Sequence, residues 1–196
     1  MTTSLAASPA ARSRVVPVTA ALWFILAVGF SAAGGLARLP FPGGQLVILA
    51  LTAAAIFAVT AVGPVRAWVD SLSVNTIVGF HAVRLAGVAF VVLGARGLVA
   101  PEFATRAGWG DVAAALGAIA LVAVPAFRTR WLLNAWNVYG LLDLIVAVGT
   151  ATIVVATGRI PGMQPILQLP LSLVPLFFVP VLVASHIALF RRINAR

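Results

Sequence analysis

Long apolar segments alternate along the chain with short stretches rich in proline, glycine and arginine. Six of these segments approach the ~20 residues that an α-helix needs to cross a bilayer. None alternates apolar and polar residues over about ten positions, which is the pattern of a transmembrane β-strand. The sequence therefore predicts an all-α fold, a bundle of six transmembrane helices near residues 18–36, 45–62, 74–94, 111–127, 131–155 and 167–190.

Turn residues and helix signals indicate the boundaries of these spans. The Pro- and Gly-rich stretch at residues 40–44 separates the first two spans. Asp111 is expected to begin the fourth span, where its carboxylate would accept hydrogen bonds from the first free amides. Pro170, Pro175 and Pro180 recur at intervals of five and are expected to bend the sixth span, because each proline removes a backbone amide.

The N-terminal part of the chain allows two interpretations. Residues 1–16 are small and polar and are expected to form a disordered tail, with residues 17–196 as a single transmembrane bundle. The first span also resembles a signal peptide ending near Ser31-Ala32-Ala33, whose removal would leave five spans. We expect this span to be retained, because its apolar run continues past that point.

Composition narrows the function classes. The chain has 196 residues, of which 62% are hydrophobic and 9% charged, too little charge for a soluble domain of this size. Its net charge of +9 does not indicate nucleic-acid binding, because the arginines stand singly or in pairs between apolar runs. The absence of cysteine excludes disulfides, thiolate metal sites and covalently attached haem, and two histidines exclude a three-histidine zinc site.

The distribution of arginine predicts the orientation in the membrane. With Arg84 set aside as intramembrane, one face of a six-span bundle carries eight arginines and the other carries four. The richer face holds both termini and the connections between spans two and three and between spans four and five. Since positive residues accumulate on the cytoplasmic side, both termini are expected to be cytoplasmic.

Polar and ionisable residues lie inside three of the predicted spans. A charge at the depth of Arg84 costs about 2.5–3.5 kcal/mol on insertion scales, so a partner is expected. Asp143 lies at a similar depth on the fifth span, counted at ~1.5 Å per residue, and the two residues are predicted to pair. His81 shares a helix face with Arg84 and lies near the level of His186. The predicted intramembrane polar site, on spans three, five and six, comprises His81, Arg84, Asn137, Tyr139, Asp143 and His186.

The second half of the chain carries three groups of residues in a recognisable order. These are Gly108-Trp109-Gly110-Asp111, then Trp136-Asn137-Val138-Tyr139-Gly140-Leu141-Leu142-Asp143-Leu144, and finally Leu169-Pro170-Leu171, Pro175, Val179-Pro180 and His186. In these features, residues 75–190 resemble an uncharacterised family of small bacterial multi-span membrane proteins. The resemblance implies a multi-pass protein of the bacterial cytoplasmic (inner) membrane and highlights these positions, without naming an activity.

Three functions remain open for the polar site. The leading interpretation is small-solute or proton-linked transport or binding, because intramembrane ionisable residues commonly mark pathways. A second is a membrane redox protein with haem b held between His81 and His186, on different helices at one depth. A third is a non-catalytic scaffold or a partner subunit of a membrane complex, with Asp111, Pro175 and Pro180 in structural roles.

An enzyme is the least favoured class, because no set of nucleophile, base and acid is visible in the sequence. The expected partners are the lipid bilayer, a small solute or a proton, and a membrane subunit or a second copy of the chain. Nucleic acid is not expected as a partner.

Overall fold

The computed structural model describes residues 9–195, and residues 9–13 of these by their backbone alone. In this part of the chain the structure is all-helical, and six segments are long and apolar enough to cross a membrane. They are Arg14–Ala32, Gly43–Ala61, Val74–Ala95, Pro101–Ala123, Arg130–Ala156 and Val174–Asn194. The prediction of a six-span all-α bundle is confirmed.

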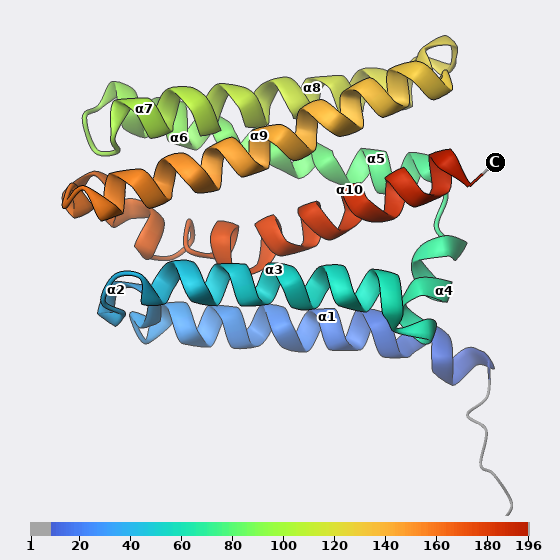
Figure 1. Cartoon of the computed structure of the whole chain (residues 1–196), viewed down its shortest axis with the longest axis horizontal. Helices are drawn as coiled ribbons and strands as arrows, with labels where there is room; N and C mark the ends of the chain where they lie inside the picture. The colour runs from blue at the N-terminus through green and yellow to red at the C-terminus, as the bar shows by residue number, and fades with distance from the viewer. Residues whose placement is uncertain (1–8, 196) are drawn as a thin grey trace, which may run out of the picture.

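Three of the spans are regular helices and three are composite (Figure 1). The regular ones are α1 (Pro9–Ala32), α3 (Gly43–Ala61) and α9 (Arg130–Ala156). Span three joins α5 (Val74–Phe80), the 3-10 turn η1 (His81–Ala86) and α6 (Gly87–Ala95). Span four joins α7 (Pro101–Phe103), the π-helical turn η2 (Ala104–Gly108) and α8 (Trp109–Ala123). Span six joins the π-helical turn η5 (Val174–Phe178) and α10 (Val179–Asn194). The connectors hold α2 (Gly35–Arg38), α4 (Gly63–Ser71) and the 3-10 turns η3 (Pro125–Phe127) and η4 (Ile160–Leu167).

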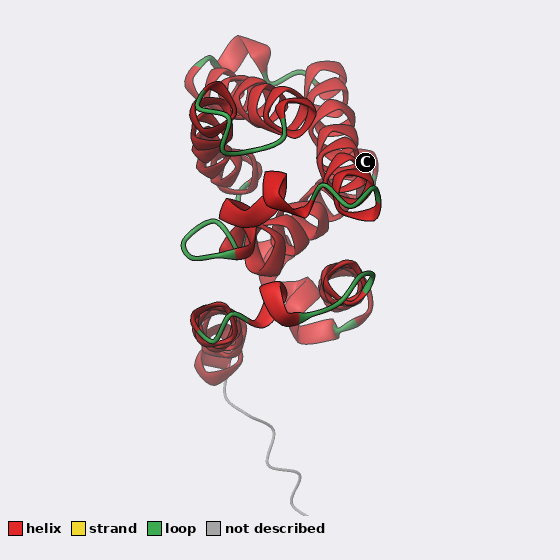
Figure 2. Cartoon of the chain, turned by 90° about the vertical axis from the view of Figure 1, so that its left-hand side faces the viewer, coloured by secondary structure: helices red, strands yellow, loops and turns green. Residues whose placement is uncertain are grey.

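The spans form two layers joined by α10. Helices α1 and α3 make an N-terminal hairpin on one side, and spans three, four and five gather on the other (Figures 1 and 2). Helix α10 packs against both α3 and α9 and therefore lies between the two groups. Its C-terminal arginines strengthen this link, because Arg191 donates to Val59 O at 2.7 Å and Arg192 donates to Leu72 O at 2.6 Å.

The outside of the bundle is apolar. Large hydrophobic side chains are exposed along the outer faces of the hairpin, among them Leu22, Ile25, Leu26, Leu46, Leu49 and Phe57. A soluble protein would bury such residues, whereas lipid tails solvate them without penalty. The protein is therefore a multi-pass membrane protein.

The interior of the second layer is packed through small residues. Ala114, Ala115 and Ala118 of α8 are completely buried, and α8 lies against η1 of span three. Small side chains let helix backbones approach closely in a membrane, where interhelical contact depends on packing and hydrogen bonds. This close approach brings polar side chains of neighbouring spans within hydrogen-bonding distance.

Several boundaries differ from the prediction. The fourth span begins at Pro101, so Asp111 lies well inside the helix and does not cap it. The sixth span begins at Val174, because residues 160–167 form the 3-10 turn η4 and residues 168–172 form a bend and a turn, so Pro170 precedes the span and does not bend it. Pro175 lies in the π-helical turn η5, and Pro180 lies in the first turn of α10. Helix α1 already includes residues 9–16, while residues 1–8 of the predicted tail lie outside the described residues.

A single cysteine tests the topology, because the chain has none of its own. Ala126 lies between spans four and five and Thr157 follows span five, and both are exposed. In intact bacterial spheroplasts, a membrane-impermeant maleimide should label Thr157→Cys, whereas Ala126→Cys should react only after lysis. Labelling of both positions from outside would contradict a membrane crossing between them, and the reverse pattern would overturn the predicted orientation.

Candidate functional site

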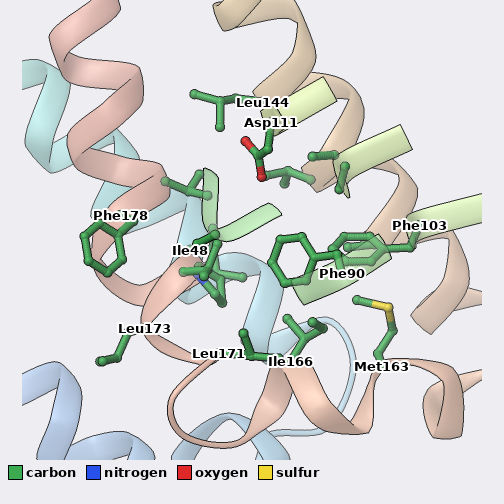
Figure 3. Close-up of a pocket in the computed structure, with 18 of the residues that line it drawn as sticks. Ile48, Phe90, Phe103, Asp111, Leu144, Met163, Ile166, Leu171, Leu173 and Phe178 are labelled. Atoms are coloured by element: carbon green, nitrogen blue, oxygen red, sulfur yellow. The ribbon is translucent and has the colours of Figure 1, made fainter. Parts of the chain in front are cut away.

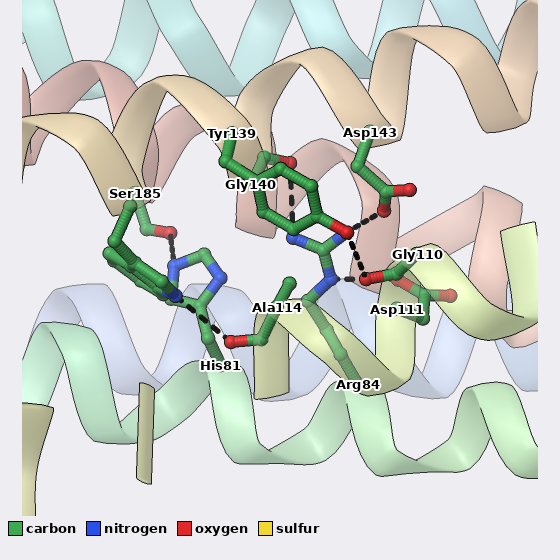
Figure 4. A network of polar contacts seen from close by, with 10 residues as sticks. His81, Arg84, Gly110, Asp111, Ala114, Tyr139, Gly140, Asp143 and Ser185 are labelled. Carbon is green, nitrogen blue, oxygen red and sulfur yellow. Dashed lines mark hydrogen bonds and ion pairs between the residues drawn. The ribbon is translucent and has the colours of Figure 1, made fainter. Parts of the chain in front are cut away.

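The 3-10 turn of span three aligns its two polar side chains. With three residues per turn, side chains at positions i and i+3 eclipse one another, so His81 and Arg84 project in one direction. Both are buried, at 0% and 3% exposure. Figure 4 shows them rising side by side from span three toward α9.

Arg84 is held by two carboxylates from two helices. Its Nε donates to Asp111 Oδ1 at 2.7 Å, its Nη1 donates to Gly140 O at 3.0 Å, and its Nη2 donates to Asp143 Oδ2 (Figure 4). The predicted Arg84–Asp143 ion pair is therefore confirmed. We call Arg84, Asp111 and Asp143 the charge cluster.

Asp111 is the member of the charge cluster that sequence reasoning missed. It was expected to cap a helix, but the helix begins at Pro101, and the side chain of Asp111 accepts from Arg84 instead. A signal for the true start was present, because proline favours the first helical position and Glu102 suits the first turn. Counted from Pro101 at ~1.5 Å per residue, Asp111 reaches a depth of ~15 Å, in the middle of the bilayer.

Two glycines make room for the charge cluster. A Cβ at Gly110 would overlap Asp143 Oδ1, so this glycine lets α9 bring Asp143 against span four. A Cβ at Gly140 would lie 2.6 Å from His186 Cε1 and 3.2 Å from Arg84 Nη1. Both Arg84 and His186 therefore pack against Gly140.

A second set of polar residues packs around the two histidines. The rings of His81 and His186 lie 4.3 Å apart between centroids, and the indole of Trp136 lies 5.0 Å from the first and 5.5 Å from the second. His81 Nε2 lies 2.9 Å from Ser185 Oγ, and His186 Nδ1 lies 2.7 Å from Asn137 Oδ1. We call these five residues the histidine cluster; its two imidazoles and Asn137 are completely buried.

The hydrogen bonds fix which nitrogen of each imidazole carries the proton. Ser185 Oγ donates its only proton to Leu182 O, so His81 Nε2 must be the donor to Ser185. Asn137 donates through Nδ2 to His186 O, so its Oδ1 accepts from His186 Nδ1. The remaining nitrogens, His81 Nδ1 and His186 Nε2, are buried and unprotonated, and their lone pairs have no hydrogen-bond partner among the described residues.

The histidine cluster does not fit a bis-histidine haem. Such a haem lies between its two axial imidazoles, which must face the iron from opposite sides of the macrocycle. Here the two rings contact each other directly, and Trp136 closes one side of the pair. No group of three or more metal-ligating side chains is found in the described residues either.

The predicted site residues do not all gather at one point. Asn137, His81 and His186 belong to the histidine cluster, and Arg84 and Asp143 belong to the charge cluster. Tyr139 lies at the outer side, 44% exposed, with its hydroxyl 3.5 Å from Gly110 O. The site thus draws on spans three, four, five and six, one span more than predicted.

An apolar cavity of about 450 Å³ adjoins the charge cluster. Arg84 and Asp111 border it at one end, and Met163, Ile166 and Leu171 of the connection before span six lie at the other (Figure 3). Apolar side chains from all six spans line it, among them Phe24, Ile48, Phe90, Phe103, Leu144 and Phe178. A concave apolar site of roughly 300–1,000 Å³ with few polar groups is typical of small-molecule binding.

The fold and the buried polar residues define a multi-span membrane protein with an intramembrane polar site. Residues 42–194 match a family model described as a domain of unknown function, DUF8737, so the chain belongs to this family. The match supports the expected resemblance to an uncharacterised family, and it covers most of the chain. Comparison with curated proteins and with solved structures found no match.

Removal of the Arg84 charge should destabilise the bundle strongly. Arg84→Gln leaves two buried carboxylates without their cation and should lower the free energy of unfolding by about 3–5 kcal/mol. The measurement is unfolding in mixed micelles, followed by tryptophan fluorescence. Arg159→Gln is the matched control, because Arg159 pairs with Glu102 at the surface and exposed pairs contribute little. Equal losses in both variants would refute a special role for the charge cluster.

Gly140 should not tolerate even one added carbon. Gly140→Ala places a methyl group against His186 and Arg84 and should lower the free energy of unfolding by about 1–3 kcal/mol. Gly149 lies on the same helix with open space around its Cβ position, so Gly149→Ala should be neutral or stabilising by up to about 1 kcal/mol. Thermal unfolding in detergent compares the two, and a neutral Gly140→Ala would contradict the close contact.

Proposed function

We propose that this protein binds a small solute within the membrane and that binding or transport of the solute is linked to a proton. The observation that supports this most strongly is the position of the charge cluster. Asp111 bonds to the buried Arg84 and also borders the apolar cavity, so a solute in the cavity would contact a group of the ion-pair network directly.

Charge balance in the cluster supports the proton link. Arg84 carries one positive charge, while Asp111 and Asp143 supply two carboxylates. With both carboxylates ionised, one negative charge is left over at a depth where an unbalanced charge is costly. A proton or a cationic group of a solute restores neutrality, so the occupancy of the site and its proton content are coupled.

The histidine cluster supports the same proposal. In the part of the chain that the structure describes, His81 Nδ1 and His186 Nε2 accept no hydrogen bond, so each imidazole can take up one further proton. His186 Nε2 would lie 2.9 Å from a Cβ at Gly140, beside the Arg84 guanidinium. The two imidazoles therefore extend a row of proton-accepting groups from the charge cluster toward the C-terminal half of α10.

The proposal includes a location in the bacterial cytoplasmic membrane and an orientation in it. Placed in the bacterial cytoplasmic membrane with both termini inside, the protein has its connection between spans five and six on the outer side. Met163 and Ile166 of that connection line the end of the cavity remote from Asp111. A solute would then enter from the outer side or from the surrounding lipid and meet the charge cluster at mid-depth.

A scaffold or partner subunit is the second candidate. It is favoured by the closed packing of the histidine cluster, in which Trp136 Nε1 donates to Ala114 O at 2.9 Å and locks α9 to α8. Such a network fixes helix register without any transported solute. The two candidates differ in whether protons move through the site.

Proton movement in proteoliposomes separates these two functions. With an imposed membrane potential and a trapped pH indicator, the wild-type protein should move protons, and Asp143→Asn should slow this at least about tenfold because one titrating carboxylate is lost. Asp70→Asn is the control, since Asp70 lies at the surface with Arg66 and Arg191. Proton movement that is absent, or unchanged in folded Asp143→Asn, would favour the scaffold.

A further inference from the structure

The cavity beside Asp111 combines apolar walls with an acceptor at one end. We propose that it binds a lipophilic organic cation, with an ammonium group against the Asp111 carboxylate and an apolar body in the space that the six spans line. This rests on the proposed solute site and adds its chemical class.

The walls select an apolar body. Phe90 of α6, Ile48 of α3 and Phe178 of η5 line the space, and Ile166 and Leu171 lie opposite Asp111 (Figure 3). Besides Arg84 and Asp111, the polar residues that line the cavity are Gln45 and Thr152, and the Thr152 hydroxyl donates to Val148 O at 2.8 Å within its own helix. A ligand therefore finds mainly apolar contacts along its length, and burying that length is favourable in proportion to its apolar surface.

The polar end selects a donor that carries positive charge. Asp111 accepts from Arg84 through Oδ1, and Oδ2 has no partner in the described part of the chain. Arg84 already directs three of its five N–H donors to Asp111, Asp143 and Gly140 O, so most of its hydrogen-bonding capacity is used within the protein. Because the cluster holds one carboxylate more than it has cations, an ammonium group gains both a charge-assisted hydrogen bond and charge balance.

Ligand and proton compete for the same negative charge. The titratable or charged groups near the Asp111 carboxylate are Arg84 from span three and Asp143 from α9, and the Tyr139 hydroxyl lies close by, 3.5 Å from Gly110 O. When an ammonium ion enters, the proton that balances the cluster in its absence leaves to the solvent. No covalent bond to carbon forms or breaks, and total charge is conserved.

Direct binding of n-octylammonium to the full chain in lipid nanodiscs tests this inference. Equilibrium dialysis with labelled ligand, corrected by empty nanodiscs, should show saturable binding, and a pH indicator in weak buffer should report up to about one proton released per ligand. Octanoate, with a chain of the same length and the opposite charge, should show no saturable binding. Tight binding of octanoate, or no saturable binding of octylammonium, overturns the inference.

Three variants locate the ligand. Asp111→Asn keeps an oxygen for Arg84 and should weaken binding about tenfold or more, the loss of one charged hydrogen bond. Ala151→Phe fills the cavity without touching the charge cluster and should abolish binding. Leu142→Phe adds a ring on the lipid-facing side of the same helix, where Leu142 is 55% exposed, and should bind as the wild type does.

The outcomes separate this inference from the proposed function. Unchanged affinity in folded Ala151→Phe would show that the ligand does not occupy the cavity. Failure of octylammonium to bind, together with proton movement that depends on Asp143, would remove the cation and leave the proton-linked site. Binding without proton release would support the cavity and overturn the competition.

Discussion

The burial of one guanidinium in the middle of the bilayer is the constraint on which the rest of the bundle depends. Arg84 is almost completely buried within the protein, so the groups that balance its charge and accept its hydrogen bonds must come from neighbouring helices. Asp111 comes from α8, and Asp143 and Gly140 O come from α9. Spans three, four and five must therefore approach closely, and the buried alanines of α8 allow this.

The same constraint explains why the two polar clusters adjoin. The 3-10 turn of span three aligns His81 with Arg84, so the imidazole enters the bundle one turn from the guanidinium. The carbonyl of Gly140 accepts a hydrogen bond from Arg84, and His186 packs where a side chain at Gly140 would lie. The irregular turn and one glycine together place two imidazoles and three charged groups in a single row inside an otherwise apolar bundle.

The features that depend on helix length and on depth in the membrane could be predicted from the sequence. The number of spans follows from apolar length, and the Arg84–Asp143 pair and the proximity of His81 to His186 follow from counting residues along helices. The role of Asp111 was missed because Gly108-Trp109-Gly110-Asp111 was interpreted as the start of the fourth span, whereas the span begins at Pro101 and those glycines serve close helix contact. The π-helical turns and the cavity depend on packing between distant segments, which no local pattern records.

The second carboxylate is what favours a functional over a purely structural interpretation. One carboxylate balances one guanidinium, and even a balanced buried pair contributes little stability relative to well-packed apolar side chains. A cluster that existed only to fix helix register would need Arg84 and a single partner. Asp111 instead adds a second carboxylate at the wall of a cavity, and with both carboxylates ionised the cluster holds one negative charge more than Arg84 balances. A buried carboxylate in excess is tolerated when a proton or the cationic group of a solute supplies the missing positive charge. The cavity reaches Asp111 and therefore gives such a cation access to it.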